Sequence, residues 1–212
     1  DKLRNPGSAV NIGLIGKYVE LQDAYKSILE AFIHAGAMNQ CKVNIVNVHS
    51  EFITAENVSE KLSQLDGLLV APGFGSRGVE GKIESVRYAR ENKMPFFGIC
   101  LGMQMAVIEY ARNVLGWKDA HSTEMDPDTA HPVIALMEEQ KKIVNKGGTM
   151  RLGSYSCKIE KNTLAHRVYQ NDNINERHRH RWEFNNKYLQ AFVDHGLRSE
   201  EHTSELQSRQ YL

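Results

Sequence analysis

The stretch Gly98-Ile99-Cys100-Leu101-Gly102 decides the fold, because an apolar run over 94–99 ends there and a helical pattern over 102–115 begins. A cysteine between two glycines at a strand-to-helix turn matches a nucleophile elbow, in which the middle side chain lies on a tight, strained bend. A thiol at a helix N-terminus is favoured as the reactive thiolate. The amide of Leu101 would then face the oxyanion formed when the sulfur attacks a carbonyl. Cys100 is therefore the candidate nucleophile, and the alternative is a buried cysteine packed at a strand end.

Strands and helices alternate along the first half of the chain. This alternation predicts an α/β fold with a mostly parallel central sheet that is covered by helices on both faces. The reactive loops of such a sheet lie at the carboxyl ends of its strands, so the glycine-rich loop over 71–78 and the Cys100 turn should share one rim. We predict strands over 9–15, 41–48, 67–70 and 94–99, and helices over 23–36, 58–65, 81–92 and 102–115.

Beyond Trp117 the alternation weakens. We expect a strand over 133–137, a polar segment over 138–146 and a loop followed by a strand over 147–155. Residues 177–181 read Arg-His-Arg-His-Arg, and in a strand the two histidines would share one face. Clustered arginines suit recognition of a carboxylate or phosphate, and a solvated charged strand is the alternative. No acidic or cysteine partner stands at a telling offset, so no metal site is predicted.

Composition narrows the class of protein. The 212 residues hold 26 Lys and Arg against 26 Asp and Glu, and zero formal charge disfavours nucleic acid and anionic membranes as partners. Three well-separated cysteines predict neither a disulfide framework nor a zinc site, and they fit a reducing cytoplasm. No apolar run approaches the roughly 20 residues that cross a bilayer, so we expect a soluble protein.

Further motifs share a pattern with one family. They are Gly-Lys-Tyr at 16–18, Asp-Ala-Tyr at 23–25, Gly-Phe-Gly at 73–75, Arg-Gly at 77–78, Glu-Gly-Lys at 80–82, Ala-Arg at 89–90, Ser-Thr-Glu at 122–124, His-Pro at 131–132, the run 147–153 and the run 176–181. With the Cys100 turn, they resemble the class I (triad) glutamine amidotransferase domain of the CTP synthase family. The resemblance covers about residues 10–197.

The resemblance implies a doubly wound, flavodoxin-like α/β domain that hydrolyses L-glutamine to glutamate. The ammonia released would pass to a synthetase domain of the same polypeptide, which aminates ATP-activated UTP to CTP. The resemblance implies no cofactor in this domain, with ATP and Mg²⁺ in the synthetase domain, and a homotetramer with GTP as effector. Residues 1–9 would be a lead-in from the synthetase domain. Residues 198–212 resemble a translated sequencing adapter, so we expect a non-native tail.

The resemblance also implies roles for single residues. Cys100 would form the glutamyl thioester, and the amides of Gly73 and Leu101 would bind the oxyanion. Glu124 would pair with the α-ammonium of glutamine and Arg181 with its α-carboxylate; without the family, Glu124 is an ordinary surface carboxylate. The residues expected to contact the substrate are Gly73, Leu101, Gly102, Met103, Gln104, Glu124 and Arg181.

Two departures from the family pattern stand out. Ala71-Pro72-Gly73 replaces Pro-Gly-Gly, with Gly73 retained, and no His-Pro-Glu segment supplies the triad histidine and glutamate. His178 and His180 are the nearest substitutes, but they lie in the arginine segment. We therefore expect a domain that lacks its C-terminal strand or strands, has an exposed sheet edge and does not turn over. The alternatives are a glutamine-binding or regulatory module without turnover and another cysteine hydrolase of the same fold.

Overall fold

The computed structural model describes residues 6–136 and 151–197. The chain divides into two compact units, residues 1–109 and 110–212, and each is described by itself. The predicted polar segment over 138–146 and the predicted tail over 198–212 lie outside the described residues. No helix within the described residues is long and apolar enough to cross a membrane.

The first unit contains the predicted parallel sheet. Each of its described strand pairs is parallel, in the order β2-β1-β3-β4, and this order matches the first four strands of a flavodoxin-like sheet. The predicted strands are confirmed, with shifts of a residue or two at their ends. They are β1 (Ser8–Gly16), β2 (Cys41–His49), β3 (Gly67–Val70) and β4 (Phe96–Gly98).

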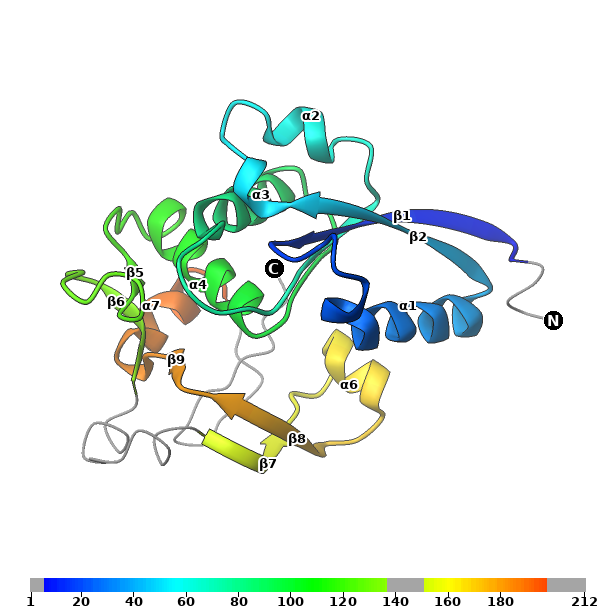
Figure 1. Cartoon of the computed structure of the whole chain (residues 1–212). Coiled ribbons are helices and arrows are strands. Elements are labelled where there is room, and N and C mark those ends of the chain that lie inside the picture. The colour runs from blue at the N-terminus through cyan, green and yellow to red at the C-terminus, as the bar shows by residue number, and fades with distance from the viewer. Residues whose placement is uncertain (1–5, 137–150, 198–212) are drawn as a thin grey trace. The chain divides into compact units, whose positions relative to one another are not determined.

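Helices flank this sheet on both sides. Figure 1 shows α1 on one side of β1 and β2, and α2 on the opposite side. The helix predicted over 23–36 is in fact a short 3-10 helix followed by α1, because Tyr25 leaves helical geometry at φ −125° and is buried in the core. The elements are η1 (Gln22–Tyr25), α1 (Lys26–Asn39), η2 (Ser50–Phe52), α2 (Val58–Leu62), α3 (Val79–Glu91) and α4 (Leu101–Asn113).

Alternating side chains of the central strands fill two cores. Leu14 and Leu69 face each other across β1 and β3 and pack in one cluster with Tyr25 and Ala71, joined by apolar residues of α1. Their neighbours Ile15 and Val70 point to the opposite face, where α3 packs against β1 and β3. Burial on both faces explains why β3 is apolar throughout.

An ion pair joins α3 to α4 inside the first unit. Arg90 donates from Nε to both carboxylate oxygens of Glu109 at 3.0 Å, and from Nη2 to Oε1 at 2.8 Å. The Glu109 side chain is 0% exposed, whereas that of Arg90 is 25% exposed. Removing Arg90 would therefore leave a buried carboxylate without its guanidinium.

The second unit contains one parallel and two antiparallel strand pairs in its described part. Strand β6 lies between β5, which is parallel to it, and β9, which is antiparallel, while β7 pairs with β8 in a separate two-stranded sheet. Aromatic rings of Phe184, Phe192 and Tyr110 pack together beside the three-stranded sheet. The elements are β5 (His121–Ser122), β6 (Pro132–Leu136), β7 (Arg151–Lys158), α6 (Leu164–Tyr169), β8 (Asn173–His180), β9 (Trp182–Phe184), η4 (Asn186–Tyr188) and α7 (Leu189–Asp194).

Candidate active site

The Cys100 turn joins β4 directly to α4. Cys100 has φ +54°, in the left-handed region that residues with a side chain occupy at a cost. The peptide is held there because Ile99 N donates to Val70 O at 3.1 Å and Gly102 N donates to Ile99 O at 2.9 Å. The predicted strained bend is confirmed, and the sulfur lies at the N-terminus of α4.

The two glycines of the turn allow main chain to meet main chain. A Cβ placed on Gly102 would lie 2.1 Å from Val70 O, and one on Gly98 would lie 2.7 Å from the carbonyl carbon of Gly102. Both distances are far below any real contact of a Cβ atom. The first turn of α4 therefore rests on the end of β3, as the flanking glycines predict.

The loop after β3 reaches the same rim. A Cβ placed on Gly73 would lie 3.5 Å from Leu101 Cδ2, 3.7 Å from Lys17 Cε and 3.7 Å from Lys82 Nζ. The structure thus brings the two predicted oxyanion residues, Gly73 and Leu101, beside each other next to the Cys100 turn. Their role as oxyanion donors remains a prediction.

Two buried lysines hold this loop. Lys82 is 0% exposed and its Nζ donates to Ala71 O at 2.8 Å, while Lys17 is 6% exposed and its Nζ donates to Phe74 O. Burial first, and then the charge of Lys17, lower the pKa of Lys82 from 10.5 to about 8, against an opposing effect of Cys100. Sequence analysis assigned no role to either lysine. The signal for Lys82 was its place on the apolar face of α3, three residues after Val79 and four before Val86.

The other residues of the first unit that are predicted to contact the substrate lie in the first turn of α4. Gly102 and Gln104 are buried and Met103 is half-buried. Gln104 N donates to Cys100 O at 3.1 Å, so this turn of helix starts at the candidate nucleophile itself. Leu101 to Gln104 thus form the helical turn that directly follows Cys100, and their role in substrate binding remains a prediction.

Strand register in the second unit brings Glu124 and Arg181 to one end of the three-stranded sheet. Ser122 and Phe184 both pair with Ile134 of β6, while Trp182 pairs with Leu136 at the carboxyl end of β6. Glu124 follows β5 and Arg181 precedes β9, so both residues lie at this carboxyl end.

Arg181 also carries a buried hydrogen-bond donor. Its Nε is buried without a hydrogen-bond partner in the described part of the chain, and its Cζ lies 5.1 Å from the Trp182 ring centroid. A buried guanidinium N–H without an acceptor suits an anionic ligand.

The two histidines of the arginine segment share a face of β8, as predicted. Their Nδ1 atoms are 3.4 Å apart, and the ring of His178 meets that of Tyr155 edge-on. Among the described residues, no group of three or more His, Cys, Asp or Glu side chains could hold a metal ion.

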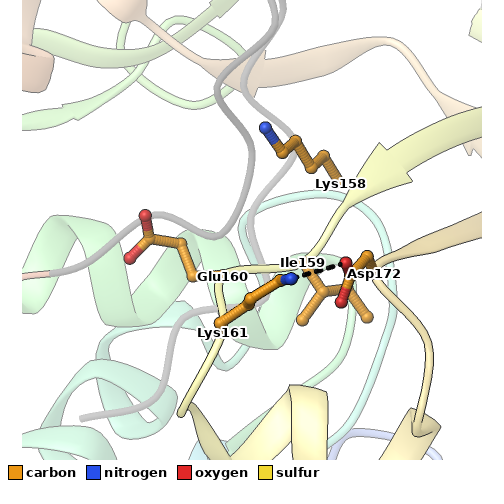
Figure 2. A pocket seen from close by; sticks show the side chains of 5 residues that line it. All are labelled: Lys158, Ile159, Glu160, Lys161 and Asp172. Atoms are coloured by element: carbon orange, nitrogen blue, oxygen red, sulfur yellow. Dashed lines mark ion pairs between the residues drawn. The ribbon is translucent and has the colours of Figure 1, made fainter.

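The second unit contains a hollow of about 320 Å³. Figure 2 shows its lining, in which Lys161 Nζ pairs with Asp172 Oδ2 at 3.1 Å. None of its lining residues belongs to the predicted site. They are Lys158, Ile159, Glu160, Lys161 and Asp172.

Comparison with known proteins identifies the family. Residues 20–209 match the family described as glutamine amidotransferase class-I. The chain belongs to the class I glutamine amidotransferases.

Relatives of this amidotransferase include CTP synthases of two bacteria. That of Flavobacterium johnsoniae is 66% identical over 198 residues, and that of Aquifex aeolicus is 57% identical over 195 residues. These alignments cover 93% and 92% of the amidotransferase chain, but only 37% and 36% of the relatives. The chain therefore spans little more than a third of the length of these relatives.

A solved structure resembles the amidotransferase in fold. It is titled as the glutaminase domain of Trypanosoma brucei CTPS with bound acivicin, and its TM-score is 0.82 at 36% identity. The match covers 96% of the amidotransferase chain and 79% of the solved chain. The predicted fold class, an α/β domain of the class I amidotransferase type, is confirmed.

Proposed function

We propose that this chain is the glutamine amidotransferase domain of a CTP synthase, and that in the complete enzyme L-glutamine is hydrolysed through a thioester on Cys100. The observation that carries the proposal is the Cys100 turn, where a strained cysteine at a helix N-terminus stands beside Gly73 and Leu101. Strain of this kind at a reactive side chain is typical of active sites. Membership of the amidotransferase family supports glutamine as the substrate.

In the proposed reaction, the Cys100 thiolate attacks the side-chain carbonyl carbon of glutamine and forms a carbon–sulfur bond. The carbonyl oxygen becomes an oxyanion, which accepts hydrogen bonds from the amides of Gly73 and Leu101. When the tetrahedral intermediate collapses, the C–N bond breaks and the nitrogen leaves as ammonia after gaining a proton. Water then attacks the thioester, which releases glutamate and restores the thiol.

The α-groups of glutamine require opposite charges on the protein. Glu124 would pair with the α-ammonium and Arg181 with the α-carboxylate, for which a guanidinium offers two parallel donors. Both residues lie at the carboxyl end of β6. The Arg181 Nε, which is buried without an acceptor among the described residues, supports this assignment.

The length of the relatives supports a partner domain. A synthetase domain would bind ATP and Mg²⁺ and use the ammonia to convert UTP to CTP, while this chain supplies no cofactor. A homotetramer and a response to GTP are further expectations for the complete enzyme. The cytoplasm is the expected location.

A diazo-ketone analogue of glutamine tests the proposal, because its electrophilic carbon takes the position of the substrate amide. We expect mass spectrometry to find the adduct on Cys100, with protection by L-glutamine but not by D-glutamine, and with weaker protection in Arg181→Ala. Labelling of Cys41 and Cys157 at the same rate, or a lack of protection, would refute the site.

Turnover is measured in the same samples as ammonia release. We expect background release, since the sequence contains no His-Pro-Glu segment to move the proton. Rapid release would show that another group of this chain acts as the base.

A further inference from the structure

Lys82 carries a buried ammonium group, and apolar packing around it does not offset the free-energy cost of burying that charge. The residue sits on α3 with 0% exposure, among apolar neighbours of the same helix face. An unpaired charge in such a place is expensive and is usually balanced by a counter-charge. Within the described parts of the chain, no carboxylate pairs with Lys82, and the acceptor of its Nζ is Ala71 O.

The position of Lys82 Nζ points to the thiol site. Nζ lies 3.7 Å from the place of a Cβ on Gly73, whose other neighbours there are Leu101 and Lys17. The electrostatic effects on Lys82 come from two groups, Lys17 and Cys100. Of these two groups Cys100 is the one that can become negative, and it directly precedes Leu101, whose side chain reaches Gly73 from the same rim.

We propose that Lys82 is a positioning residue that stabilises the Cys100 thiolate and, through Ala71 O, fixes the loop that carries Gly73. This inference rests on the proposed function for the role of Cys100, and it adds a cation to the helix N-terminus as a second source of thiolate stabilisation. Lys17 also holds this loop, because its Nζ donates to Phe74 O three residues after Ala71.

The Lys82 ammonium and the Cys100 thiolate stabilise each other in the pH range in which both groups are charged. An opposite charge at close range typically lowers the pKa of an acid by about 1–3 units. The pKa of Lys82 is about 8, so its ammonium is mostly protonated at pH 7 and is available to stabilise the thiolate. The charged or titratable groups that act on Lys82 are Lys17 of the turn after β1 and Cys100 of the turn before α4.

The test is the pH profile of Cys100 alkylation by iodoacetamide in the full chain, resolved by mass spectrometry from Cys41 and Cys157. This reaction needs neither glutamine nor the triad histidine, so its outcome is independent of whether the chain acts on glutamine. In Lys82→Met we expect the midpoint of the profile to move upward by about one pH unit, with several-fold slower alkylation at pH 7. Lys61→Met, which removes an exposed lysine of α2, is the matched control and should leave the midpoint in place.

Equal midpoints in Lys82→Met and Lys61→Met would overturn the inference and make Lys82 a purely structural lysine. If Lys82→Met does not fold, as judged by circular dichroism, the unmodified chain can still overturn the inference. Its midpoint should lie clearly below the ordinary cysteine value of about 8.5. A midpoint at or above that value would show that no cation stabilises the thiolate.

The loop has its own measurement. Amide hydrogen exchange of the 71–75 segment should be faster in Lys82→Met than in Lys61→Met, because the bond from Nζ to Ala71 O is lost. Unchanged exchange would show that Lys82 does not fix the loop. Only its electrostatic effect on Cys100 would then remain.

Discussion

Replacing Gly102 by alanine should destabilise the first unit strongly, because there is no room for a methyl group. The added Cβ would lie 2.1 Å from Val70 O, 2.8 Å from Val70 C and 3.1 Å from Val70 Cβ. Val70 is 0% exposed, and its carbonyl accepts the hydrogen bond from Ile99 N that helps to hold the Cys100 turn. The neighbour is therefore rigid main chain, and α4 must move away from β3 by about 1 Å.

Overpacking of this kind costs about 1–3 kcal/mol, and contact with backbone places Gly102→Ala at about 3 kcal/mol. With a urea dependence of about 2 kcal/mol per molar, the midpoint of unfolding falls by about 1.5 M. Far-UV circular dichroism during urea titration measures this shift. Gly73→Ala is the matched control, since its Cβ would come no closer than 3.5 Å to any atom. A Gly102→Ala midpoint equal to that of Gly73→Ala would refute the claim that α4 rests on the main chain of β3.

Three other outcomes follow from the described contacts. Cys100→Gly should be more stable than Cys100→Ala by about 1 kcal/mol in urea unfolding, because glycine adopts φ +54° without strain; equal stabilities would contradict a strained turn. Arg90→Met should cost about 3 kcal/mol at pH 7 by leaving the Glu109 carboxylate buried, whereas Arg87→Met on the same helix, which breaks more exposed pairs, should cost under about 1 kcal/mol. Between pH 8 and 10.5 the unfolded chain keeps a proton on Lys82 that the folded chain has lost, so folding stability gains up to about 3 kcal/mol with rising pH; a Lys82→Met variant with the same gain would assign it to other groups.

The sheet of the first unit could be predicted because turn residues mark the ends of its strands. Strand β3 was predicted with its bounds, since Gly67 opens it and the sequence turns to Pro and Gly after Ala71. The β4-to-α4 turn was predicted from Gly98 and Gly102 for the same reason. The structure adds the physical cause, which is the contact of α4 with the backbone of β3.

Strand β8 was harder to predict as an element. Its sequence from Asn173 to His180 contains one aliphatic residue, Ile174, and its other half-buried positions carry Glu176, His178 and His180. A half-buried strand with polar side chains on both faces has no hydrophobic period to detect. Only the shared face of the two histidines could be deduced in advance.

The candidate site was predictable where backbone geometry limits the choice of residue, and not where charge is buried. The sequence pointed to Cys100 and Leu101 through the turn itself. Lys82 lies on a helix face that otherwise predicts a core, so a hydrophobic pattern treats its charge as an exception. The roles of Glu124 and Arg181 stay predictions from the resemblance, although strand register places both at one end of their sheet.

Direct contact between the main chains of α4 and β3 has an evolutionary consequence. Gly98 and Gly102, which have no side chains, set the location of the sulfur, and the shapes of the surrounding side chains do not. The side chains of the interior around the sulfur can therefore diverge without displacing it. Gly98 and Gly102, by contrast, have no acceptable replacement. Distant homologues with different interiors should therefore superimpose best at this cysteine.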